Sequence, residues 1–118
     1  NYDFLVVDFH GEITSEKMAM GHFFDGKATL VVGTHTHVPT NDARILENGT
    51  AYQTDVGMSG DYNSVIGMDK QNPIHTFTKG YRSEGRFTPA NGIGKMCGVY
   101  IHSDDRTGLA INIETYQI

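Results

Sequence analysis

The chain has 118 residues and a net charge of −5 with histidine counted as neutral, and its lysines and arginines are scattered. This composition fits one modest domain and offers no basic stripe for duplex nucleic acid or for an anionic membrane surface. Cys97 is the only cysteine, which excludes an intrachain disulfide, and the lack of a signal-like segment or a membrane-length apolar run favours a cytoplasmic protein.

The first predicted unit is β-α-β. Residues 3–9 are typical of a fully buried strand, residues 15–24 of a helix with Thr14 as its N-cap, and residues 28–33 of a second strand. The two strands of such a unit run parallel, so we expect both to end at the same rim of the sheet. A buried parallel strand needs neighbours on both faces. Because the chain reaches this strand almost at once, without an initiator methionine, we expect the carboxyl part of a longer protein rather than simple removal of that methionine.

The rest of the chain predicts mainly hairpins. Asn48-Gly49 between two short apolar runs is a strong hairpin signal, and a second hairpin is expected at the carboxyl end. The expected elements are a first hairpin (44–46 and 51–54), a glycine-rich loop (55–60), a short helix (72–79), an irregular polar segment (81–91) and a last hairpin (93–103 and 109–117). The prediction is therefore an α/β fold in one domain over residues 1–118.

Three histidines follow the two predicted strands. His10 comes after the first strand, and His35 and His37 come after the second. Residues two apart on an extended segment point the same way, and imidazole is a common metal ligand. The spacing predicts a metal site at the rim. His35 and His37 could bind the same cation, or each could bind one of two adjacent cations. The alternative is a set of hydrogen-bonded histidines with no metal.

Short polar residues accompany these histidines. Thr34 and Thr36 could orient an imidazole N–H or hold the turn. Asp8 could bind a metal, accept the N–H of a ligating ring or cap the end of the strand, and we favour the last two roles over ligation. Asp55, in its glycine-rich loop, could reach a ligand at the rim, but we expect it to form an Asx turn. Cys97 lies in a strand-like run and is expected to be structural rather than nucleophilic.

Two segments carry a family resemblance: VVDFHGEITSEKMAMGHFFDGKATLVVGTHTHVPTNDARIL and GTAYQTDVGMSGDYNSVIGMDK. They resemble the carboxyl half of the bacterial 2′,3′-cyclic-nucleotide 2′-phosphodiesterases, which are calcineurin-like metallophosphoesterases. The resemblance implies part of a four-layer α/β/β/α sandwich with a dinuclear metal centre. It implies that His10 and His35 bind one metal and His37 the other. An aspartate, a bridging carboxylate, an asparagine and a catalytic histidine would come from an amino-terminal half, so no catalytic residue is expected in this chain.

The implied activity is metal-dependent hydrolysis of phosphodiesters, with 2′,3′-cyclic nucleotides opened to 3′-nucleotides. The implied cofactors are two divalent ions, iron or manganese, with zinc also compatible with the ligands. Two neighbouring cations need anionic ligands to offset their repulsion, and three neutral imidazoles cannot provide this. We therefore expect the chain to be inactive alone, with a homo-oligomer or a complementing amino-terminal half as partner. The alternatives are a non-catalytic binding or regulatory module and a related phosphatase or nuclease.

Overall fold

A four-stranded sheet in the order β1-β2-β4-β3 forms the centre of the fold. The computed structural model describes residues 2–82 and 85–118, so residues 83 and 84, within the predicted irregular segment, lie outside the described residues. The strands of this sheet are β1 (Val6–His10), β2 (Leu30–Thr34), β3 (Arg44–Ile45) and β4 (Ala51–Gln53).

The β-α-β prediction is confirmed. β1 and β2 pair in parallel with His10 opposite Thr34, and α1 (Thr14–Phe24) connects them. The two strand ends that carry the histidines therefore meet at one rim. The N-cap prediction is wrong, because the extended residue Ile13 takes the cap position and its carbonyl accepts the Lys17 N–H.

The prediction of a fully buried first strand is also wrong. The residues of β1 alternate between exposed and half-buried, and Val6 is 61% exposed. β2, in contrast, is buried from Leu30 to Gly33. The difference follows from the strand order: β2 lies between two strands, whereas β1 is at the edge and pairs, among the described residues, with β2 alone.

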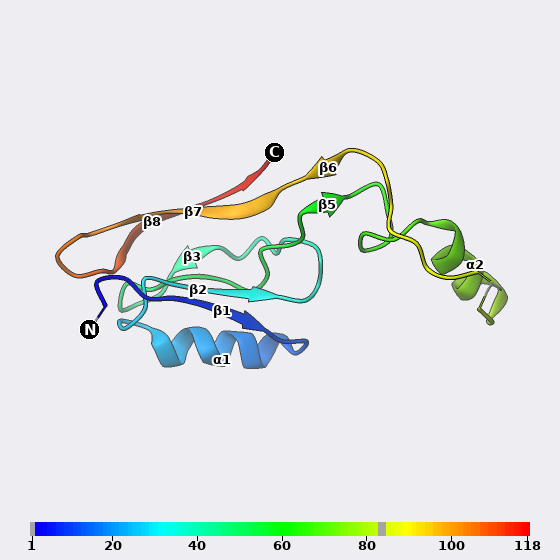
Figure 1. Cartoon of the computed structure of the whole chain (residues 1–118). Coiled ribbons are helices and arrows are strands. Elements are labelled where there is room, and N and C mark those ends of the chain that lie inside the picture. Colours follow the sequence, from blue (N-terminus) through cyan, green and yellow to red (C-terminus); the bar gives the residue numbers. More distant parts are fainter. Residues whose placement is uncertain (1, 83–84) are drawn as a thin grey trace.

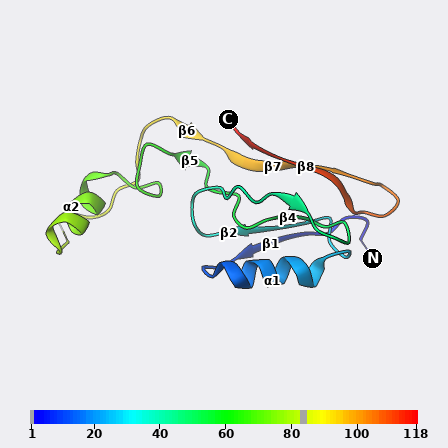
Figure 2. The ribbon, with the colours of Figure 1, turned by 180° about the vertical axis from the view of Figure 1, so that it is seen from behind.

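Two layers cover the sheet, as Figures 1 and 2 show: α1 on one face and the hairpin of β7 (Cys97–Ser103) and β8 (Ala110–Gln117) on the other. Strand alternation divides the core between them. Val31 packs toward α1, in a cluster with Met20 and Phe24, while Leu30 and Val32 pack with Ala110 of β8. The described residues thus form a mixed α/β fold with helix, sheet and hairpin layers.

Both predicted hairpins are confirmed. β3 and β4 are antiparallel on either side of the Asn48-Gly49 turn, and Gly49 has the positive φ, 100°, that such a turn requires. β7 and β8 pair from Cys97 to Ser103. Residues 94–95 of the expected last hairpin instead form β6 (Gly94–Lys95), which pairs with β5 (Gly60–Asp61).

An arm projects from the body beyond β5 and β6 and carries α2 (Gln71–Lys79), within one residue of the helix predicted there (Figure 1). The radius of gyration is 17.3 Å, whereas a compact chain of this length has about 13.5 Å. The fold is therefore elongated. Neither helix in the described part of the chain has the length and apolar character needed to cross a membrane.

Candidate metal centre

The ends of β1 and β2 bring two of the three predicted histidines together. Nδ1 of His35 lies 3.3 Å from Nε2 of His10, and the ring centroids are 5.2 Å apart with the planes at 75°. Both side chains are exposed. Two ring nitrogens at this distance share a proton or a cation, because two facing lone pairs would repel each other.

A short hydrogen-bond chain fixes the tautomer of His10. Its Nδ1 lies 3.1 Å from the Thr34 hydroxyl oxygen, and that hydroxyl donates to Oδ1 of Asp8 at 3.3 Å. Because the carboxylate only accepts, the hydroxyl proton points to Asp8 and its oxygen accepts the N–H of His10. Nε2 of His10 then carries the lone pair that faces His35, as a metal ligand requires.

His37 is oriented by a different partner. Its Nδ1 donates to the carbonyl oxygen of Ile66 at 2.8 Å, so its Nε2 also carries a free lone pair. The structure does not bring this ring into a cluster with the other two. Among residues 2–82 and 85–118, no group of three or more His, Cys, Asp or Glu side chains is arranged to hold a metal ion.

The segment after β2 is a turn, so the expectation that His35 and His37 share one face of an extended segment is wrong. β2 ends at Thr34, and the two histidines have φ values of 145° and 65°. Residues other than glycine rarely adopt a positive φ. Thr36, between them, donates its hydroxyl to the Val38 carbonyl and its backbone N–H to Oδ2 of Asp55. Of its two predicted roles, Thr36 therefore takes that of holding the turn.

Sequence reasoning missed a buried ion pair behind this turn. Nζ of Lys17 lies 2.9 Å from Oδ2 of Asp55, and the two side chains are 1% and 0% exposed. The predicted Asx turn is present too, because Oδ1 of Asp55 accepts the Gly57 N–H. The signal for Lys17 was its helical spacing: with Met20, Gly21 and Phe24 it forms the side of α1 that faces the sheet.

Two opposed effects set the ionisation of Asp55. Burial alone would raise the pKa of this carboxyl, but hydrogen bonds from Lys17 and from the Thr36 and Gly57 N–H groups outweigh it, and the pKa is lowered. The carboxylate is therefore charged at neutral pH and accepts three hydrogen bonds.

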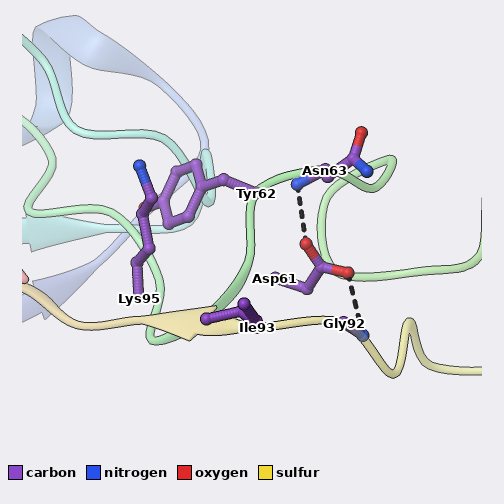
Figure 3. A pocket seen from close by; sticks show the side chains of 6 residues that line it. All are labelled: Asp61, Tyr62, Asn63, Gly92, Ile93 and Lys95. Atoms are coloured by element: carbon purple, nitrogen blue, oxygen red, sulfur yellow. Dashed lines mark hydrogen bonds between the residues drawn. The ribbon is translucent and has the colours of Figure 1, made fainter.

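A separate hollow of about 580 Å³ lies where the arm joins the body, between β5 and β6 (Figure 3). Its walls contain none of the three predicted ligands; they are Asp61, Tyr62, Asn63, Gly92, Ile93 and Lys95. The Asp61 carboxylate ties the two strands' ends together by accepting the backbone N–H groups of Asn63 at 2.7 Å and Gly92 at 3.1 Å. Cys97 donates its thiol to the Tyr62 hydroxyl at 3.0 Å.

Comparison with curated proteins gives related sequences over nearly the whole chain. A 2′,3′-cyclic-nucleotide 2′-phosphodiesterase of Bacillus subtilis is 50% identical over 111 residues, which are 94% of this chain and 41% of that protein. A putative phosphatase/phosphodiesterase of Mycoplasma genitalium is 43% identical over 117 residues, which are 98% of this chain and 41% of that protein. The chain thus spans about two fifths of the length of these relatives.

Solved structures agree. A hypothetical protein from Thermus thermophilus superposes with a TM-score of 0.89 at 41% identity, over 100% of this chain and 45% of that one. A phosphatase from Mycoplasma pneumoniae gives 0.89 at 42% identity, over 100% of this chain and 42% of that one. The family described as YmdB-like protein matches residues 1–116. The chain therefore belongs to the YmdB-like protein family.

Proposed function

We propose that this chain supplies one side of a dinuclear metal centre that hydrolyses phosphodiesters, with 2′,3′-cyclic nucleotides opened to 3′-nucleotides. The observation that carries the proposal is the facing pair of ring nitrogens on His10 and His35, one of them oriented by the Thr34–Asp8 chain. The name of the Bacillus subtilis relative supports this substrate class.

The donor set fits a divalent metal. The 3.3 Å between the two nitrogens matches adjacent ligands that each lie about 2.1 Å from one ion. His10 and His35 would hold one ion, and His37 would offer its Nε2 to the other. Iron, manganese and zinc all accept imidazole nitrogen. When bound, the two ions would activate a water molecule and polarise the phosphoryl group.

The chain's own residues prepare this site. Thr34 and Asp8 hold His10 in the tautomer that presents Nε2, and the Ile66 carbonyl does the same for His37. Imidazoles bring no negative charge, however, and two neighbouring cations require it. We infer that an amino-terminal segment supplies the carboxylates and the proton donor, completes a four-layer sandwich and makes the enzyme active. The greater length of the relatives supports this inference.

Phosphatase activity on the same centre is the second candidate. Its support is the names of the two Mycoplasma relatives, one curated and one of known structure. A panel of 2′,3′-cyclic nucleotides, bis-p-nitrophenyl phosphate and p-nitrophenyl phosphate separates the two, because only a phosphatase prefers the monoester.

Metal analysis tests the centre itself. The 118-residue chain and its His10→Ala, His35→Ala and His37→Ala variants are loaded with Mn²⁺ and desalted, and the retained metal is measured. His22→Ala, an exposed histidine of α1, is the matched control. We expect His10→Ala and His35→Ala to retain less metal than the wild type, and the His22→Ala control to retain as much. His37→Ala, whose ring would bind the other ion, should keep the ion at His10 and His35. No retained metal in the wild type, with unchanged stability in His37→Ala, would favour a non-catalytic module. Robust turnover by the chain alone would refute its dependence on an amino-terminal segment.

A further inference from the structure

We propose that the buried Lys17–Asp55 pair is a positioning device, which holds the turn of residues 35–37 in the strained shape that presents its two rings. The geometric part of this inference stands on the contacts alone, and its meaning for catalysis rests on the proposed function.

The Asp55 carboxylate is the point at which helix and turn meet. Its Oδ2 lies 2.9 Å from Nζ of Lys17 on α1 and accepts the Thr36 N–H at 2.9 Å. Thr36 lies between His35 and His37, and both of these histidines have a positive φ. One carboxylate oxygen thus connects the helix to the middle residue of the turn. The other oxygen is occupied by the Gly57 N–H, which fixes the carboxylate plane.

Stability alone does not account for an ion pair at this place. A buried pair can often be replaced by apolar side chains of similar volume without loss of stability, since desolvation offsets the attraction. An apolar pair, however, could not accept the Thr36 N–H. Asp55 supplies that acceptor, and Lys17 makes it possible to bury the acceptor as an anion.

The glycine at position 33 leaves room for the Lys17 side chain. A Cβ at Gly33 would lie 2.7 Å from Cδ of Lys17 and 1.9 Å from the Thr54 carbonyl oxygen. Gly33 precedes Thr34, whose hydroxyl orients His10. The lysine side chain therefore passes directly over the end of β2, where the turn begins.

The test separates packing from positioning. Lys17→Met/Asp55→Leu replaces the pair by apolar side chains and removes the acceptor, whereas Lys17→Met/Asp55→Asn keeps a neutral acceptor. Asp42→Asn is the matched control, because the Asp42 carboxylate accepts hydrogen bonds from Thr40 and Thr54 but makes none to the turn. The readouts, on the whole 118-residue chain without metal, are the hydrogen exchange of the Thr36 amide and the imidazole NMR shifts.

In Lys17→Met/Asp55→Leu we expect Thr36 exchange to rise at least about tenfold, as for the loss of one charge-assisted hydrogen bond, and the His35 and His37 rings to shift. The His22 and His102 rings should stay unchanged. Lys17→Met/Asp55→Asn should give a smaller rise, and Asp42→Asn none. If the leucine variant does not fold, the asparagine variant decides by the same readouts. Wild-type exchange and ring shifts in the folded variant would overturn the proposal.

A second experiment separates the proposed metal centre from the proposed positioning role of the ion pair. Mn²⁺ added to the wild type should broaden the ring resonances of His10 and His35. If it broadens none, these two rings alone do not bind Mn²⁺, while the exchange and shift data still decide whether the pair positions the turn.

Discussion

Replacing Gly33 by alanine tests how closely β2, α1 and the loop after β4 are packed behind the histidine turn. The new Cβ would lie 1.9 Å from the Thr54 carbonyl oxygen and 2.7 Å from Cδ of Lys17. Backbone must therefore move by about 1 Å before the first contact reaches the shortest distance that real Cβ atoms show. The flexible lysine stem can yield, but the carbonyl belongs to the chain that carries Asp55.

The cost follows from what this movement breaks. Overpacking in a core costs about 1–3 kcal/mol, and loosening a buried ion pair adds part of the roughly 3–5 kcal/mol that breaking one costs. The Val56 N–H also donates to the Gly33 carbonyl at 3.0 Å and would be displaced. We expect Gly33→Ala to lower the free energy of unfolding by about 3–4 kcal/mol.

Urea unfolding followed by circular dichroism measures this loss. Gly94→Ala is the matched control, because a new Cβ at Gly94 would lie 3.8 Å from its nearest atom, the Gly60 carbonyl carbon. We expect this substitution to change the unfolding free energy by about 0.5 kcal/mol or less. A Gly33→Ala variant that loses less than about 1 kcal/mol would refute the close packing of Lys17 and Thr54 over this glycine.

Three further predictions concern charge and orientation. Lys17→Met alone leaves Asp55 buried without its cation, so it should reduce the unfolding free energy by about 3–5 kcal/mol in urea titrations; a near-neutral result would contradict the burial of the pair. Thr34→Val removes the hydroxyl that orients His10, so Mn²⁺ affinity measured by calorimetry should fall about 10–100-fold; an unchanged affinity would count against that role. Burial alone would raise the pKa of Asp42, but hydrogen bonds from Thr40, Thr54 and Arg44 hold it below the ordinary value. This carboxyl therefore stabilises the fold above its unfolded pKa of about 3.9, and that stability is lost as the pH falls through the lower folded pKa. Asp42→Asn should flatten the fall in stability between about pH 4 and pH 2, and an equally steep fall would show that other carboxyls control it.

The local signals in the sequence were sufficient where neighbouring residues decide the structure. Asn48-Gly49 predicted its hairpin because a turn with positive φ is a property of those two residues. Parallel pairing placed the ends of β1 and β2 at one rim, and His10 and His35 accordingly meet there.

Contacts between residues distant in the sequence determine the features that the local sequence pattern did not predict. The turn at residues 35–37 departs from an extended path because Asp55, nineteen residues beyond Thr36, accepts its N–H. Lys17 is buried because a carboxylate 38 residues away is its partner. The exposure of β1 depends on its place in the strand order, which the apolar run at residues 4–7 does not contain.

The projecting arm and open β1 edge also affect how the chain responds to denaturant. Its accessible surface is 7900 Å², which is the surface of a compact protein of about 17–18 kDa, although its mass is 13.0 kDa. Less new surface is then exposed on unfolding. Because both the denaturant slope and the heat-capacity change scale with that newly exposed surface, this fold unfolds over a broader denaturant range than a compact domain of the same length.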